Sequence, residues 1–192
     1  MTPGGAAWRA AARAALAACA LLTAAATSSG EETPALTEYD VKAAYLYNFA
    51  KFVEWPPPDE ESARRRFVIA VLGDDPFGRT LEETLAGKTV GDRSFAVRRV
   101  STPEQAEGAQ IVFVSASEWA RLPHVLRVLD GAGALTVGDM RQFAERGGMI
   151  GFRMEGRKVR FDINPEPVER AGLRMSSQLL RLARIVTADE RR

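Results

Sequence analysis

The alternation of hydrophobic and polar positions is clearest in a segment that begins near residue 40 and ends in a proline run. Apolar side chains recur there with i, i+4, i+8, i+11 spacing, which predicts an amphipathic helix. The apolar positions are Val41, Tyr45, Phe49 and Phe52, and Asp40, Tyr47, Lys51 and Glu54 fall on the opposite side. The prolines that follow Trp55 lack backbone donors and disfavour the α region for Trp55, so the helix should end there. Asn48 lies beside the stripe, and its amide must find hydrogen-bond partners.

Strand and helix patterns alternate through the rest of the chain, as in an α/β protein. Continuous apolar runs at residues 67–72, 111–114 and 135–137 predict buried strands, and a weaker alternation at 94–100 predicts an edge strand. Helices are expected at 77–85, at 117–129 with Ser117 as N-cap, from a capping Asp139 to Glu145, and at 173–186.

The clearest hairpin pairs residues 149–154 with 159–163, and Gly147 and Gly148 turn the chain into it. The predicted fold is a single-domain α/β three-layer sandwich. Its central sheet is mixed and mostly parallel, it carries the antiparallel hairpin towards its C-terminus, and helices cover both faces.

Residues 1–26 have the composition of a secretory signal peptide. They contain no acidic residue, place Arg9 and Arg13 early, and end in Ala-x-Ala at Ala26. The apolar run is shorter than the roughly 20 residues that a membrane-spanning helix needs. The expected organisation is a signal peptide at 1–26, a flexible segment at 27–35, the α/β domain at 36–186 and a tail at 187–192.

An alternative interpretation takes Leu16-Ala-Ala-Cys19 as a lipoprotein cleavage box, which would leave Cys19 acylated. Cys19 is the only cysteine, so cleavage after Ala26 leaves no disulfide, thiol nucleophile or cysteine-based zinc site. Removal of residues 1–26 also leaves 24 basic against 25 acidic residues, a formal charge of −1. This balance gives little electrostatic attraction to nucleic acid.

No group of residues in the sequence supports catalysis, a cofactor or a metal. The turn Gly73-Asp74-Asp75-Pro-Phe77-Gly78 follows a strand but lacks both a Walker ending and a dinucleotide glycine spacing, so it reads as a capped helix start. His124, the only histidine, has no Gly-x-Ser-x-Gly elbow to partner it. A small-molecule site beyond the carboxyl ends of the strands, near residues 73–78 and 115–117, stays open as an alternative.

Five motifs in the same order make the chain, from about Leu36 to Val186, resemble the YfiR family of periplasmic regulators. They are the opening from Lys42 through Tyr45, Asn48, Phe49 and Trp55 to Pro56; the turn from Gly73 to Gly78; Gly147-Gly148-Met-Ile; Phe161-x-Ile-Asn164; and Ser176-Ser177-x-Leu-Leu. The resemblance implies a non-enzymatic periplasmic repressor that holds a membrane-bound diguanylate cyclase inactive, and so lowers cyclic di-GMP and biofilm formation. Family members often carry paired cysteines, which residues 27–192 lack.

The partner of such a repressor would be the periplasmic domain of the cyclase. An open edge of the hairpin is the expected contact, through Met149, Phe152 and Phe161 with Arg160 and Asp162 as rim charges. A homodimer and a small-molecule ligand are left open as further associations.

Overall fold

The computed structural model describes residues 36–57 and 60–187. The predicted signal peptide, the 27–35 segment and residues 188–192 of the expected tail lie outside these ranges. Within the described ranges, no helix is both long and apolar enough to cross a membrane.

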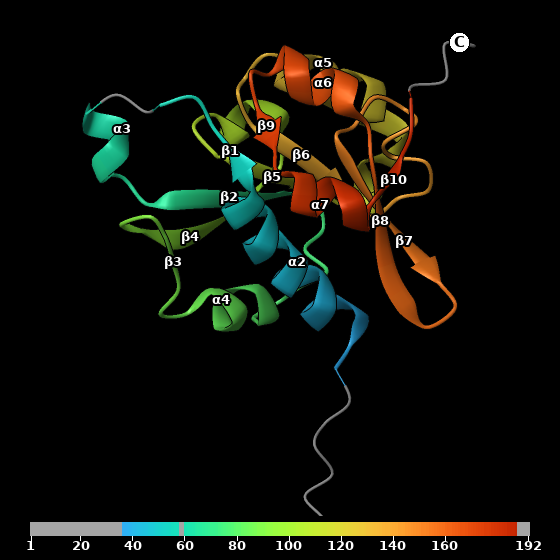
Figure 1. Cartoon of the computed structure of the whole chain (residues 1–192), viewed down its shortest axis with the longest axis horizontal. Helices are drawn as coiled ribbons and strands as arrows, with labels where there is room; N and C mark the ends of the chain where they lie inside the picture. The colour runs from blue at the N-terminus through green and yellow to red at the C-terminus, as the bar shows by residue number, and fades with distance from the viewer. Residues whose placement is uncertain (1–35, 58–59, 188–192) are drawn as a thin grey trace, which may run out of the picture. The chain divides into compact units, whose positions relative to one another are not determined.

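An eight-stranded sheet organises the domain, in the order β10-β8-β7-β6-β5-β2-β4-β3 (Figure 1). Its strands are β2 (Phe67–Leu72), β3 (Thr89–Val90), β4 (Arg93–Val100), β5 (Ile111–Val114), β6 (Leu135–Gly138), β7 (Ile150–Glu155), β8 (Lys158–Ile163) and β10 (Arg184–Ile185). Strands β4, β2, β5, β6 and β7 are parallel, β7 and β8 form the antiparallel hairpin, and β10 pairs in parallel with β8. The predicted mixed α/β sheet is confirmed.

Short helices and a two-stranded ribbon surround the sheet. The helices are α2 (Glu38–Phe52), α3 (Glu60–Arg64), α4 (Thr80–Leu85), α5 (Leu122–Leu129), α6 (Pro165–Arg170) and α7 (Ser177–Leu182), with 3-10 turns η1 (Pro103–Ala106) and η2 (Ala116–Arg121). The ribbon pairs β1 (Val53–Glu54) with β9 (Arg174–Met175).

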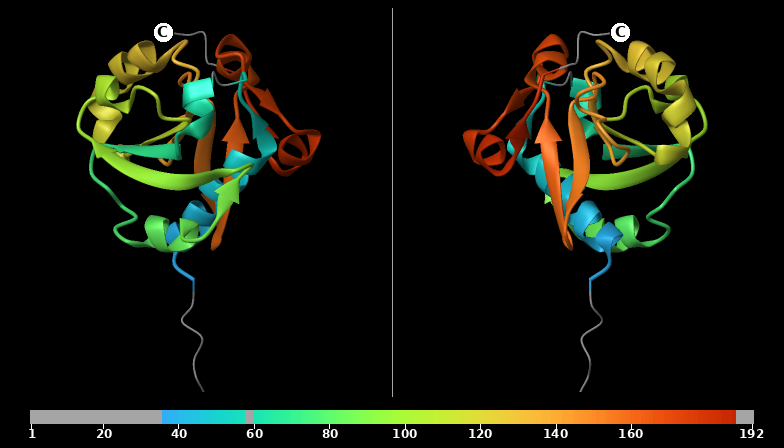
Figure 2. Two further views of the ribbon diagram at one scale, coloured as in Figure 1. Left: turned by 90° about the vertical axis from the view of Figure 1, so that its left-hand side faces the viewer. Right: turned by 90° about the vertical axis from the view of Figure 1, so that its right-hand side faces the viewer.

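Alternate side chains of the central strands enter two separate hydrophobic cores, because successive strand residues face opposite sides of the sheet. Ile69 and Phe113 belong to the core beneath α2, α4 and α7. Leu72 and Val112 belong to the core beneath α5 and η1. The layers on either side of the sheet are visible edge-on in Figure 2.

Helix α2 presents a different face to the core from the one predicted. Its fully buried side chains are Lys42, Ala43, Leu46, Phe49 and Ala50, whereas Val41, Tyr45 and Phe52 are only half-buried. The helix is rotated about its axis relative to the prediction, because Lys42 points inward and its ammonium is paired inside the protein. The helix also ends at Phe52, before Trp55, because Val53 and Glu54 pair with β9.

Three other predicted helices are wrong in extent or in existence. The 117–129 helix is divided into η2 and α5, and its capping hydroxyl belongs to Ser115. Asp139 caps no helix, since residues 139–149 form a loop of turns. The 173–186 helix shrinks to α7, because its ends pair as β9 and β10. Strand β3 pairs only with Arg93 and Ser94, so residues 95–100 of β4 pair with β2 alone and form an edge, as predicted.

Candidate partner-binding surface

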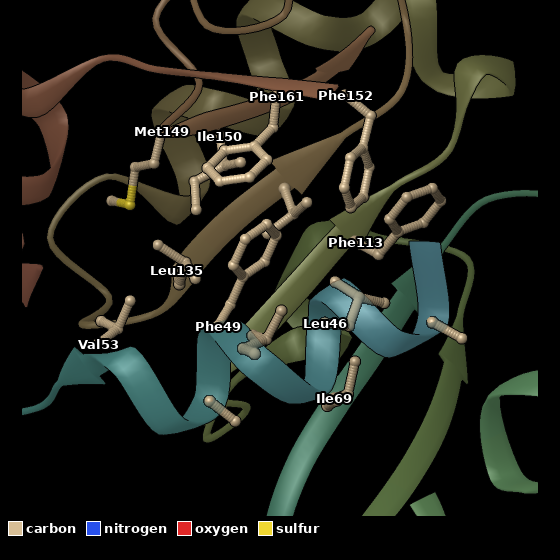
Figure 3. Close-up of a cluster of buried hydrophobic side chains, with 14 of the residues drawn as sticks. Leu46, Phe49, Val53, Ile69, Phe113, Leu135, Met149, Ile150, Phe152 and Phe161 are labelled. Carbon is tan, nitrogen blue, oxygen red and sulfur yellow. The ribbon is translucent and has the colours of Figure 1, made fainter. Parts of the chain in front are cut away.

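The β7–β8 hairpin packs against α2 through a cluster of four aromatic rings. Tyr45 and Phe49 come from α2, and Phe152 and Phe161 face each other across the hairpin. The Phe49 centroid lies 5.8 Å from that of Phe152 and 5.3 Å from that of Phe161, the latter edge-to-face. Figure 3 shows these three phenylalanines converging between the helix and the sheet. Such packing fixes the hairpin rigidly on the helix.

Three of the five predicted contact residues are buried in this core. Met149, Phe152 and Phe161 are 3%, 4% and 2% exposed. A partner cannot reach these side chains in the folded domain, so any role in binding would be to support the surface above them. Arg160 is exposed on β8, and partner binding through it stays a prediction.

Asp162 is also buried, and it forms an ionic network rather than a rim charge. Its Oδ1 accepts hydrogen bonds from Arg153 Nε and from Arg184 Nε, both at 2.9 Å, and its Oδ2 accepts from Arg184 Nη2 at 2.6 Å. Arg184 also reaches Glu145 at 3.1 Å. The hydrogen bonds to Asp162 raise the pKa of Arg184. This network attaches β10 and the 139–149 loop to the hairpin.

A groove runs between the start of α2 and the outer half of the hairpin, and we call it the helix–hairpin groove. Its volume is about 570 Å³. Apolar lining comes from Leu36, Val41, Tyr45, Met154 and Val159, basic lining from Arg157, Lys158 and Arg160, and acidic lining from Glu38, so that basic residues are in excess. Leu36 and Met154 are 78% and 46% exposed, and both line this one groove. The groove therefore combines exposed apolar surface with positive charge.

A buried ion pair holds α2 to the carboxyl end of β6 beside this surface. Lys42 Nζ donates to Asp139 Oδ2 at 2.9 Å, and Tyr39 Oη donates to the same oxygen at 2.8 Å. The side chains of Lys42 and Asp139 are 4% and 5% exposed. Burial raises the pKa of Tyr39, and the hydrogen bond to Asp139 raises it further.

The ring of Phe143 leaves no room for a side chain at Gly138 or Gly148, which precede the hairpin. A Cβ on Gly148 would lie 2.2 Å from Phe143 Cε1, and one on Gly138 would lie 2.6 Å from Phe143 Cδ2. Gly147 adopts a positive φ of 102°. Phe143 is thus clamped against the backbone, which fixes the 139–149 loop.

The remaining motif residues have structural contacts. Trp55 Nε1 donates to the carbonyl of Gln110 at 3.2 Å, and Trp55 packs edge-to-face on Phe67. Asn164 is fully buried, donating to the carbonyl of Ala144 and accepting from the amide of Glu166. Asn48 is only partly buried.

At the turn at the carboxyl ends of β2 and β5, suggested for a small ligand, side chains of the protein lie close to Gly73. Ser117 Oγ accepts from the amide of Asp74 at 2.9 Å. A Cβ on Gly73, whose φ is +88°, would lie 2.4 Å from that oxygen. Asp75 accepts from the amide of Phe77 within a local turn and pairs with Arg99, but it caps no helix. The helix predicted from residue 77 begins only at Thr80, and its N-cap Arg79 makes no side-chain capping bond. His124 is exposed, 4.0 Å from Glu104.

Sequence reasoning missed Lys42, Asp139, Phe143 and Arg184 as residues that build this region. Lys42 and Asp139 are 97 residues apart in the chain, and neither carries a local pattern that reveals burial. The one available signal was that Lys42 and the Gly147-Gly148 pair both fall inside the quoted motifs.

Solved structures resemble the fold at low sequence identity. A conserved domain protein from Vibrio cholerae O1 biovar El Tor aligns with TM-score 0.56 and 10% identity, over 78% of this chain and 60% of that one. The tryptophan-bound ABC domain from Streptococcus pneumoniae aligns with TM-score 0.46 and 12% identity, over 62% and 55%. A ligand-free substrate-binding protein with adhesive properties from Clostridium difficile aligns with TM-score 0.45 and 10% identity, over 67% and 56%.

The chain spans about three fifths of the length of the Vibrio protein, and this likeness shows the fold alone. No curated protein matches the sequence. A family model described as YfiR/HmsC-like matches residues 39–184, which is most of the chain. That range includes the α2 motif, the hairpin and the Asp162 network, and it confirms the resemblance drawn from the sequence. The chain therefore belongs to the YfiR/HmsC-like family.

Proposed function

We propose that the chain is a periplasmic, non-enzymatic repressor that binds the periplasmic domain of an inner-membrane diguanylate cyclase. Binding would hold the cyclase inactive and lower cyclic di-GMP and biofilm formation. The observation that carries this proposal is the YfiR/HmsC-like match over residues 39–184. Residues 1–26, with their signal-peptide composition, would direct export.

The helix–hairpin groove is the surface that best suits a protein partner. Met154 and Leu36 offer exposed apolar area, and Arg157, Lys158 and Arg160 surround it with positive charge. Interfaces gain most of their affinity from a few apolar or arginine contacts that become fully desolvated. A matching partner segment would carry an apolar side chain flanked by acidic residues.

The wall of the groove is held in place before binding. Tyr45 lines it and stacks on Phe49, with 5.9 Å between ring centroids, and it also contacts Phe161 edge-to-face at 5.3 Å. A preformed wall reduces the ordering cost of association. Phe152 and Phe161 would then support binding from beneath the surface, without touching the partner.

Release of the cyclase would differ from a mechanism based on intramolecular disulfides. Residues 27–192 contain no cysteine, so oxidation cannot form a bridge within that part of the chain. Release would need another signal, such as a competing ligand or a second protein.

Cellular cyclic di-GMP in the native host tests the proposal. Deletion of the gene should raise it, and the full-length chain, but not one lacking residues 2–26, should restore it. Met154→Glu should fail to restore it, because it places a charge in the apolar part of the groove. The matched control is Leu182→Glu on α7, at a side chain that is 68% exposed and outside the groove. It should restore repression fully.

The outcomes test cyclase repression and the role of the helix–hairpin groove separately. An unchanged cyclic di-GMP level on deletion would overturn cyclase repression. Equal restoration by the Met154 and Leu182 variants would leave repression in place but remove the groove as its binding surface.

A further inference from the structure

A second cleft lies away from the hairpin, between α5, α6 and the end of the 139–149 loop. Figure 1 shows α5 and α6 at the same end of the domain. The cleft has a volume of about 320 Å³, at the lower end of the range for small-molecule sites. Its walls include the apolar side chains of Pro123, Leu126, Leu129, Met149 and Pro167.

Three arginines bring positive charge to this cleft from three different segments. Arg127 belongs to α5, Arg146 to the loop and Arg170 to α6, and the one carboxylate in the lining is Asp130. Arg170 is the arginine that is neutralised, lying 2.7 Å from Glu166 and 3.6 Å from Asp130. Neither Arg127 nor Arg146 pairs with a carboxylate of the described residues, so the cleft keeps an excess of positive charge.

Arg146 is held in place with unused hydrogen-bonding capacity. Its guanidinium carbon lies 4.1 Å from the centroid of the Trp119 ring, a cation–π contact that orients the plane of the group. Its Nε is buried and has no acceptor within the described part of the chain. A buried donor without an acceptor is costly, and a ligand in the cleft does not reach this nitrogen. The part of Arg146 that lines the cleft supplies positive charge and charge-assisted hydrogen bonding for an oxyanion.

Thr136 adds a buried hydroxyl to the same lining. It is 3% exposed, and its Oγ1 accepts from the amide of Met149 at 3.1 Å. Because that bond uses a lone pair, the hydroxyl proton remains available for an acceptor in the cleft. The polar groups of the lining are therefore mainly donors.

We propose that this cleft binds a small organic anion, with its carboxylate or phosphate at Arg146 and Arg127 and an apolar body against Leu126, Leu129 and Met149. The donors select the negative charge, and the apolar walls select an attached hydrocarbon or ring. The proposal does not depend on cyclase repression, because neither the helix–hairpin groove nor its residues contribute to this cleft.

Calorimetric titration of the purified exported protein with four probes tests the site. Benzoate and phenyl phosphate carry both features of the expected ligand, inorganic phosphate lacks the apolar body, and benzylamine reverses the charge. Benzoate or phenyl phosphate should bind, and whichever binds more tightly identifies the anion. Inorganic phosphate should bind more weakly and benzylamine not at all.

Variants locate the binding within the protein. Arg146→Gln should weaken the bound probe about tenfold or more, because it removes a charge-assisted contact. Arg127→Gln should weaken it without risk to folding, since Arg127 is exposed and unpaired among the described residues. The matched control is Arg141→Gln, the same substitution in the same loop. Arg141 does not line this cleft but a separate groove beside Asp162 and Arg184, so the control should leave affinity unchanged.

Three results would overturn the proposal. They are the absence of binding by both aromatic anions, binding of benzylamine as tight as that of benzoate, and unchanged affinity in the Arg146 and Arg127 variants. Inorganic phosphate binding as tightly as phenyl phosphate would show an adventitious ion only.

Discussion

Lys42 Nζ lies 2.9 Å from Asp139 Oδ2, with both side chains almost completely buried, and this contact joins the first helix to the end of a central strand. Glu38, one turn earlier on α2, lies 2.5 Å from the same ammonium, and Tyr39 Oη donates to the same carboxylate oxygen. Asp139 Oδ1 is buried without a partner among the described residues. The pair thus fixes the rotation of α2 on the sheet at a considerable desolvation cost.

Removal of one partner of this pair should be much worse than removal of both. Asp139→Ala leaves the Lys42 ammonium buried with only the half-exposed Glu38, and should lower the free energy of unfolding by about 3 kcal/mol. The double variant Lys42→Met/Asp139→Leu should recover more than half of that loss, because apolar residues of similar size avoid desolvation. Urea unfolding measures both. Losses that simply add in the double variant would show that the pair is not coupled.

Tyr39 should make the domain sensitive to alkaline pH. Its pKa is raised in the folded state by burial and by its hydrogen bond to Asp139, whereas an unfolded tyrosine ionises with a pKa of about 10. A raised folded pKa contributes stability that is fully present below about pH 10 and is lost as pH rises further. Tyr39→Phe should flatten the decline of stability above pH 10, as measured by urea midpoints. An unchanged slope in this variant would assign the decline to other groups.

Gly148→Ala should destabilise the loop before the hairpin, because the new methyl would lie 2.2 Å from Phe143 Cε1. Overpacking of this kind costs about 1–3 kcal/mol. Phe143→Leu introduced into the same chain should restore part of the thermal midpoint, although Phe143→Leu alone should lower it. If the second substitution deepens the loss, the clash with Phe143 is not the cause.

The sequence predicted the strands far better than the helices, for a physical reason. Strand β5 is buried on both faces, so its run of apolar residues was visible without any tertiary information. The α2 stripe was drawn one face away from the true one, because an inward-facing lysine cannot be inferred until Asp139 is placed opposite it. The helix predicted at 173–186 was too long for a similar reason: apolar residues from Leu179 to Val186 have helical spacing, yet Arg184 and Ile185 pair with β8.

The hairpin was predicted from the sequence, but the burial of its side chains was not. The hairpin was found, yet its alternation could not tell which face α2 would cover, so Phe152 and Phe161 were taken as contacts when they are core. Asp162 was read as a rim charge because the two arginines that bury it lie on β7 and β10. The exposed apolar residue of the hairpin is Met154. Its exposure could not be predicted before the position of α2 was known.

Asn164 should be among the least replaceable polar residues of the fold. It is fully buried at the end of β8, where Nδ2 donates to the Ala144 carbonyl at 3.0 Å and Oδ1 accepts from the Glu166 amide at 3.2 Å, capping α6. Asn164→Ala removes the cap and one of the two hydrogen bonds to the Ala144 carbonyl, which keeps its bond from the Gly147 amide, so the free energy of unfolding should fall by about 1–2 kcal/mol. Asn48→Ala, the same substitution at a partly exposed helical position, should cause no loss and serves as the control.

Asn164→Asp separates the two hydrogen bonds of this side chain. The carboxylate keeps the cap on α6 but directs a negative oxygen at the Ala144 carbonyl, which should raise the pKa of the new carboxyl in the folded state. A raised carboxyl pKa gives stability that is present below the unfolded value of about 3.9 and lost as pH increases. The variant should therefore lose more stability than the wild type between pH 4 and pH 7 in urea unfolding. A pH dependence equal to that of the wild type would mean that the bond to Ala144 contributes little, and that Asn164 acts through its cap alone.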